Sequence, residues 1–177
     1  MTNLTVGATA LPFELPAVDG KTYAYNDFAD KQAVVVVFSC NHCPYVLAWE
    51  DRLVEIQAEY GPRGVQVLAI NANDAERYPT DSFEKMQAHA AEKGYNFPYL
   101  HDESQAVARA YGAERTPEVF VFDQAGVLHY HGLIDDNHEN PDQVQNAYLR
   151  NALDAILTGQ NPPVTNTDPK GCTIKWK

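Results

Sequence analysis

Cysteine, basic residues and long hydrophobic runs are all scarce in this chain. Its three cysteines are too few for a secreted disulfide scaffold of 177 residues. Lys and Arg number 13 against 24 Asp and Glu, and a net charge of −11 disfavours nucleic acid or an anionic membrane as partner. Residues 1–20 hold no basic leader followed by an apolar core, because Pro12, Glu14 and Pro16 interrupt it, so we expect no signal peptide and no membrane anchor. We therefore expect a cytoplasmic protein.

The composition that remains is that of a globular domain. Hydrophobic residues make up 45% of the chain and charged residues 21%, which excludes a disordered or membrane-spanning protein. The length suits about one domain, and neither an internal repeat nor a linker divides it. We predict a single domain over residues 1–177, of which residues 161–177, rich in Pro, Asn and Thr at their start, form a C-terminal tail.

Hydrophobic patterning predicts an alternation of strands and helices. The β-branched run at residues 33–38 is typical of a central strand covered on both faces. A helix is predicted from Pro44 to Tyr60, with apolar residues on one face, and Gly61-Pro62 ends it. The other predicted strands are 21–25, 65–71, 97–100, 118–123 and 127–131, and the other helices are 81–93, 104–111 and 141–157.

The order of these elements predicts the fold class. A strand–helix–strand unit gives parallel strands, and the two strands around the Gln124-Ala125-Gly126 turn form an antiparallel hairpin. We therefore predict an α/β protein with a mixed central sheet flanked by helices.

The motif whose side chains can carry out chemistry is Cys40-Asn41-His42-Cys43, directly after the predicted central strand. Two cysteines separated by two residues can form and break a disulfide with each other. A strand-to-helix junction is expected to place Cys40 at a helix N-terminus, where free N–H groups favour a thiolate. His42 either lowers the pKa of the thiol further or faces solvent without a role, while Pro44 suits the first helical turn.

These residues, together with Thr116-Pro117 ahead of the strand at residues 118–123, resemble the thioredoxin superfamily. The sequence is more similar to the peroxiredoxin-like, TlpA-like branch, which is related to the AhpC/TSA redoxins. That branch has an N-terminal extension, an inserted helical segment after the second strand, and an ending like the one at residues 171–176. The resemblance spans nearly the whole chain and implies a thioredoxin-like fold.

The resemblance also implies a function, thiol–disulfide exchange with disulfide-containing or dithiol proteins and small thiols. Cys40 would attack, Cys43 would resolve the mixed disulfide, and His42 would make the redox potential less reducing than that of thioredoxin. Pro117 would be a cis-proline, and the backbone of Thr116 would pair with a bound peptide as an added strand. No organic cofactor or metal is implied. The sequence leaves open whether the protein acts as a reductant, an oxidant or an isomerase, and it does not give the oligomeric state.

The chain departs from thioredoxin at two positions near the pair. Ser39 replaces a tryptophan, and Val34 replaces a buried aspartate that accepts a proton from the second thiol. Glu118 either points at the pair and takes over that role or is a solvated charge at a strand end.

A thiol peroxidase is the alternative function. The peroxidatic cysteine of peroxiredoxins aligns with Cys43 and is likewise followed by a proline. However, Cys40 stands where that family has a threonine, and Val36 where it has a proline. Arg115 imitates the activating arginine of that family only at an altered spacing.

Cys172 leaves two interpretations open. It is either a third redox thiol on a tail that folds over the pair, or a buried, inert cysteine that helps Ile174 and Trp176 hold the C-terminus. A metal carrier is a third class of function, with Cys40, Cys43, His42 and Cys172 as ligands. We expect no metal, because the chain has no second Cys-x-x-Cys and because His42 is expected to point away from a shared site.

Overall fold

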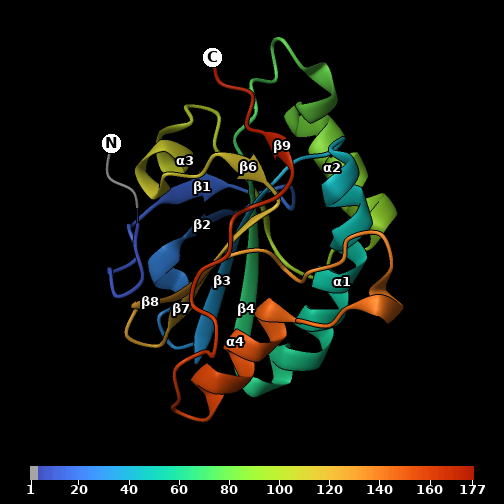
Figure 1. Cartoon of the computed structure of the whole chain (residues 1–177). Helices are drawn as coiled ribbons and strands as arrows, with labels where there is room; N and C mark the ends of the chain where they lie inside the picture. The colour runs from blue at the N-terminus through green and yellow to red at the C-terminus, as the bar shows by residue number, and fades with distance from the viewer. Residues whose placement is uncertain (1–3) are drawn as a thin grey trace.

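A five-stranded mixed sheet lies at the centre of the molecule (Figure 1). The computed structural model describes residues 4–177. Within them, no helix is both long and apolar enough to cross a membrane. Across the sheet the strands are β5 (Tyr99–His101), β4 (Val65–Asn71), β3 (Ala33–Ser39), β7 (Glu118–Asp123) and β8 (Leu128–Gly132).

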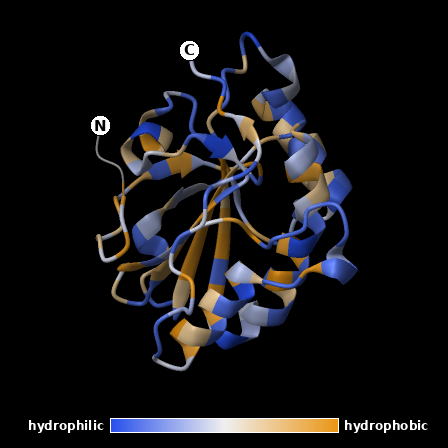
Figure 2. Ribbon diagram, in the orientation of Figure 1, coloured by the Kyte–Doolittle hydropathy of each residue, from blue (hydrophilic) through white to orange (hydrophobic). Residues whose placement is uncertain are grey.

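The central strand is β3, as predicted. It pairs in parallel with β4 and antiparallel with β7, while β7 and β8 form the predicted antiparallel hairpin. All residues of β3 are buried, because the sheet is covered on both faces and a β-branched run fits that environment. Figure 2 shows the interior strands as predominantly hydrophobic. The mixed, thioredoxin-like α/β architecture is confirmed.

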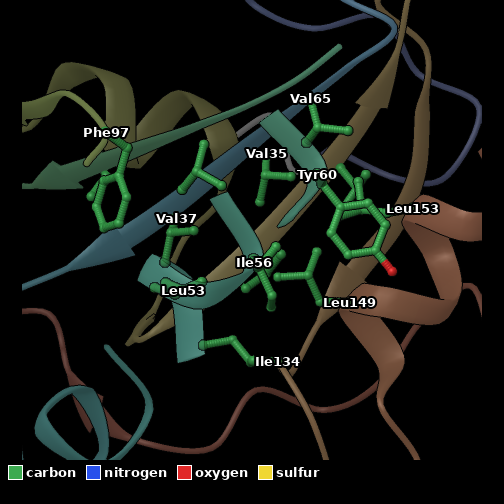
Figure 3. Packing of buried hydrophobic residues seen from close by; sticks show 14 of the residues in the cluster. Val35, Val37, Leu53, Ile56, Tyr60, Val65, Phe97, Ile134, Leu149 and Leu153 are labelled. Atoms are coloured by element: carbon green, nitrogen blue, oxygen red, sulfur yellow. The ribbon is translucent and has the colours of Figure 1, made fainter. Parts of the chain in front are cut away.

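Helices cover the two faces of the sheet. Val35 and Val37 point to the face that carries α1, α2 and α4, where Ile56 and Leu149 pack against them (Figure 3). The alternate residues of β3, such as Val36, pack against the N-terminal segment and α3. The helices are α1 (Pro44–Tyr60), α2 (Phe83–Lys93), α3 (Ala106–Tyr111) and α4 (Tyr148–Leu157), with 3-10 turns η1 (Tyr25–Phe28), η2 (Gly61–Arg63), η3 (Pro79–Asp81) and η4 (Pro141–Gln143).

Three predicted helices begin later than expected, and one of them is α3, which starts at Ala106 rather than at residue 104. The helix expected over residues 141–157 is broken into η4 and α4, because Val144 adopts an extended conformation after η4. α2 begins at Phe83 rather than Asp81, since Ser82 is its N-cap and accepts a hydrogen bond from the Lys85 amide. Asp81 therefore lies in η3 and not in the first turn of α2.

Short strands occur at both ends of the chain. The N-terminal extension forms an antiparallel pair of β1 (Glu14–Pro16) and β2 (Thr22–Ala24). The tail crosses the molecule and forms β9 (Cys172–Thr173) near its end, which pairs antiparallel with β6 (Arg115–Thr116) (Figure 1). The C-terminus therefore returns to the end of the sheet at which α1 begins.

Candidate functional site

The two cysteines of the motif lie between β3 and α1. Cys43, not Cys40, is the N-cap of α1, so the expectation that Cys40 occupies the helix N-terminus is wrong. The reason is local: the residue before a proline is driven to extended backbone, and Cys43 has φ −67° and ψ 126° ahead of Pro44. Cys40 and Cys43 are 1% and 0% exposed, and all three cysteines carry free thiols.

The position of the helix shifts the thiolate toward Cys43. A hydrogen bond from the Cys40 thiol lowers the pKa of Cys43, and the Val46 amide of the first helical turn acts in the same direction. The same bond, together with burial, raises the pKa of Cys40. Against this, Cys43 Sγ lies 3.3 Å from the Thr116 carbonyl oxygen, to which it donates while protonated. One proton is thus shared within the pair and resides mainly on Cys40.

Thr116 and Pro117 adjoin the pair, as the sequence predicted. The Thr116–Pro117 peptide bond is cis, which confirms that expectation. Thr116 touches both sulfurs, since its Oγ1 lies 3.5 Å from Cys40 Sγ and its carbonyl faces Cys43. The loop therefore brings a backbone carbonyl and a hydroxyl to the reactive atoms.

His42 contacts a carboxylate that sequence reasoning missed. Its Nδ1 lies 2.8 Å from Oδ2 of Asp81, which is fully buried and also accepts hydrogen bonds from the Asn41 amide and the side chains of Asn71 and Asn73. The Asp81 charge adds to the causes that raise the pKa of Cys40, after the bond with Cys43 and burial. In the sequence Asp81 resembles an ordinary first residue of a helix, so nothing marked it as part of a site.

Cys40, His42 and Asp81 also form a possible ligand set for a metal. One donor atom from each lies within 4.8 Å of the others, so His42 does not point away from Cys40 as expected. Both Asp81 oxygens already accept hydrogen bonds from N–H donors, however, and a cation would have to displace them. The present arrangement suits a buried anion better than a metal ligand.

Glu118 does not make the predicted contact with the pair. One carboxylate oxygen accepts hydrogen bonds from the Glu114 and Arg115 amides, and the other lies 2.9 Å from His131 Nε2. These partners satisfy a side chain that is 1% exposed, so Glu118 is not a solvated charge either. Burial lowers the pKa of His131, but the hydrogen bonds with Glu118 and Asn166 outweigh it, and the net shift is upward.

Cys172 is brought to the pair by the tail. It lies opposite Thr116 in the β6–β9 pairing and packs against Cys40, Cys43 and Val46. It is half-buried, and its proximity contributes to lowering the pKa of Cys43. Arg115, the possible activating arginine, instead donates from Nη1 to the Gly171 carbonyl at 3.0 Å and holds the tail.

Comparisons with known proteins identify relatives of the chain. A hypothetical protein from Sinorhizobium meliloti 1021 has a TM-score of 0.93 at 40% identity, covering 99% of this chain and 97% of that one. An uncharacterized conserved protein from Geobacillus kaustophilus has a TM-score of 0.93 at 44% identity, covering 98% and 93%. The thiol-disulfide oxidoreductase ResA of Geobacillus thermodenitrificans is 28% identical over 71% of this chain and 67% of its own length.

The family comparison covers the region that holds the cysteine pair and the cis-proline. Residues 6–131 match the AhpC/TSA family, and this stretch extends from the N-terminal extension into β8. Together with the thioredoxin-like sheet, the match identifies a redoxin and supports a redox role. The chain belongs to the AhpC/TSA family of the thioredoxin superfamily.

Proposed function

We propose that this protein is a thiol–disulfide oxidoreductase that exchanges a Cys40–Cys43 dithiol or disulfide with protein or small-thiol partners. The observation that carries the proposal is the meeting of both sulfurs at Thr116, directly before the cis Pro117. Both sulfurs contact Thr116 and pack in one buried cluster, so little movement separates the dithiol from the disulfide. The similarity to ResA, named a thiol-disulfide oxidoreductase, supports the same reaction class.

Because Cys43 rather than Cys40 caps the N-terminus of α1, we give the two sulfurs roles opposite to those implied by the family resemblance. The Cys43 thiolate attacks a substrate disulfide, forming a mixed disulfide and releasing one substrate thiolate. Cys40 gives up its proton to that leaving group and attacks Cys43 Sγ, which forms the Cys40–Cys43 bond and releases the second thiolate. Two electrons pass from the pair to the substrate.

A glutathione redox titration with mass-tagging of free thiols tests the function. We expect a reversible two-electron couple between Cys40 and Cys43 in the wild type, and no couple in Cys40→Ser or Cys43→Ser when Cys172 is also replaced by serine. In a Cys172→Ser background, the role assignment predicts that Cys40→Ser accumulates the mixed disulfide faster than Cys43→Ser does. A pair that never exchanges with glutathione would contradict the proposal. The cytoplasmic location remains a prediction, which cell fractionation would test.

Peroxidase activity is a second candidate, and Cys43 at the N-cap of α1 favours it. The Cys43 thiolate would attack a hydroperoxide, giving a sulfenic acid and an alcohol or water, and Cys40 would then displace water to form the disulfide. Peroxide consumption by the wild type, and its loss in Cys43→Ser, would support this activity. The absence of turnover with either hydrogen peroxide or an organic hydroperoxide would exclude it.

A further inference from the structure

The C-terminal tail occupies the strand edge at which a substrate peptide was expected. β9 pairs antiparallel with β6, and Cys172 stands directly opposite Thr116. An extended peptide that binds to a free strand edge makes the same main-chain hydrogen bonds. The residue placed there by the chain itself is a cysteine, which is the reactive residue of a disulfide substrate.

Several hydrogen bonds hold the tail in place beyond β9. The Ile174 amide donates to the Glu114 carbonyl at 2.9 Å, and the Lys175 amide donates to Oδ1 of Asn73 at 2.8 Å. Gln105 donates from Nε2 to the Lys175 carbonyl at 2.9 Å and accepts from the Lys177 amide at 3.1 Å. The tail is therefore docked through backbone and side-chain contacts on both sides of the site.

The approach of the tail to β6 depends on a glycine beside the cysteine. A Cβ atom at Gly171 would lie 1.9 Å from the Thr116 carbonyl oxygen, a separation that no side chain permits. Arg115 donates to the Gly171 carbonyl from the same strand. Gly171 thus lets the backbone come close enough for the neighbouring Cys172 to reach the pair.

Cys43 has a thiol partner on either side. Cys40 and Cys172 both pack in one cluster with Cys43 and Val46, and Cys172 stands opposite Thr116, whose carbonyl oxygen lies 3.3 Å from Cys43 Sγ. Cys40 and Cys43 are buried, whereas Cys172 is half-buried. The positive charges of Lys175 and Arg115 favour a Cys172 thiolate, although burial and Cys43 raise the pKa of Cys172 overall.

We propose that Cys172 is an internal exchange partner of the redox pair. Resting on the proposed function, the step begins with the Cys40–Cys43 disulfide. The Cys172 thiolate attacks Cys43 Sγ, the Cys43–Cys172 bond forms, the Cys40–Cys43 bond breaks, and Cys40 leaves as a thiolate that takes up the proton lost by Cys172. The number of disulfides is unchanged, so no external oxidant or reductant is needed.

This exchange also indicates the class of substrate. With β9 docked, the edge of β6 is occupied, and a polypeptide cannot pair with Thr116. A small thiol or disulfide reaches the half-buried sulfur of Cys172 without displacing the tail. Low-molecular-weight thiols are therefore the partners for the docked state.

The test uses full-length Cys40→Ser protein treated with glutathione disulfide well below millimolar concentration. Neighbouring groups in one chain act at effective concentrations of about millimolar or more, so an internal link should form in preference to stable glutathionylation. Trypsin releases Cys43 in the peptide 32–52 and Cys172 in the peptide 171–175. We expect a disulfide between these two peptides, at a rate independent of protein concentration, and its loss when the sample is oxidised in denaturant.

Cys43→Ser is the matched control, because Cys40 contacts Thr116 Oγ1 and the 32–52 peptide remains the same apart from the substituted cysteines. We expect little link between Cys40 and Cys172 in this variant. Glutathione retained on Cys43 of Cys40→Ser, with Cys172 free, would overturn the proposal even if the wild-type Cys40–Cys43 couple titrates normally. Absence of that wild-type couple would instead overturn the proposed function.

Discussion

His42 Nδ1 lies 2.8 Å from Oδ2 of Asp81, a carboxylate with no exposed surface. The pair joins the loop that carries the cysteines to η3, because Asp81 also accepts a hydrogen bond from the Asn41 amide at 2.8 Å. A histidine inside a Cys-x-x-Cys motif is thus matched by a buried negative charge. The electrostatic effect of His42 on the thiols must be considered together with that charge.

Asp81→Asn should lower the pKa of Cys40, because it removes a negative charge that stabilises the protonated thiol. The asparagine side chain also places an N–H group next to the N–H donors that now bond to the carboxylate. The lost hydrogen bond should lower the free energy of unfolding by about 2 kcal/mol. The pH dependence of Cys40 alkylation, in a background of Cys43→Ser and Cys172→Ser, gives the pKa. His42→Ala retains the carboxylate and should not lower the pKa of Cys40; a decrease in both variants would contradict the assignment.

Cys40→Ala should raise the pKa of Cys43, because the largest contribution that lowers it is the hydrogen bond from the Cys40 thiol. In the wild type, Cys43 alkylation should persist to more acidic pH than an ordinary thiol permits, and this acidic limit should move upward in the variant. Mass spectrometry of the 32–52 peptide measures the profile. Cys40→Ser retains a hydroxyl donor and should show a smaller shift than Cys40→Ala; equal profiles would argue against the bond.

Gln105→Ala should release the tail from the site. The variant loses hydrogen bonds to Lys175 and Lys177, worth about 2 kcal/mol together, so detachment of the tail should become about 30-fold more frequent. Hydrogen exchange of the amides at residues 172–175 and the alkylation rate of Cys43 should both increase. Gln87→Ala is the control, because it removes a 3.4 Å hydrogen bond to the Val18 carbonyl and no hydrogen bond to the tail. Unchanged exchange in Gln105→Ala would show that the remaining contacts of the tail hold it without Gln105.

The His131–Glu118 pair should make stability depend on pH. Because the folded-state pKa of His131 is raised, its contribution is fully present below the unfolded value of about 6.5 and is lost as pH rises through the folded value. Relative to His131→Gln, the wild type should therefore be more stable by about 2 kcal/mol at low pH, the range of a hydrogen bond to a charged group. Urea unfolding across this pH range measures the difference. A difference that does not diminish with rising pH would exclude the linkage.

Local sequence patterns were sufficient to predict the bounds of the central strand and helix elements. The bounds of β4 and α1 agree with those predicted, since an apolar run, Pro44 and Gly61 act through neighbouring residues. The prediction for α4 was less accurate, because residues 144–147 are not helical although their sequence continues the helical pattern. The cis geometry before β7 was reached only through a family resemblance, as most bonds before proline are trans.

The sequence by itself determined that the chain has a Cys-x-x-Cys motif at the junction of a buried strand and a helix. Only the tertiary structure decided that Asp81 faces His42 and that Cys172 meets the pair. The physical reason is that these contacts join residues tens of positions apart, through strand pairing and hydrogen bonds that leave no periodic signal in the sequence. Short-range propensity therefore located the reactive sulfurs, and long-range packing selected their partners.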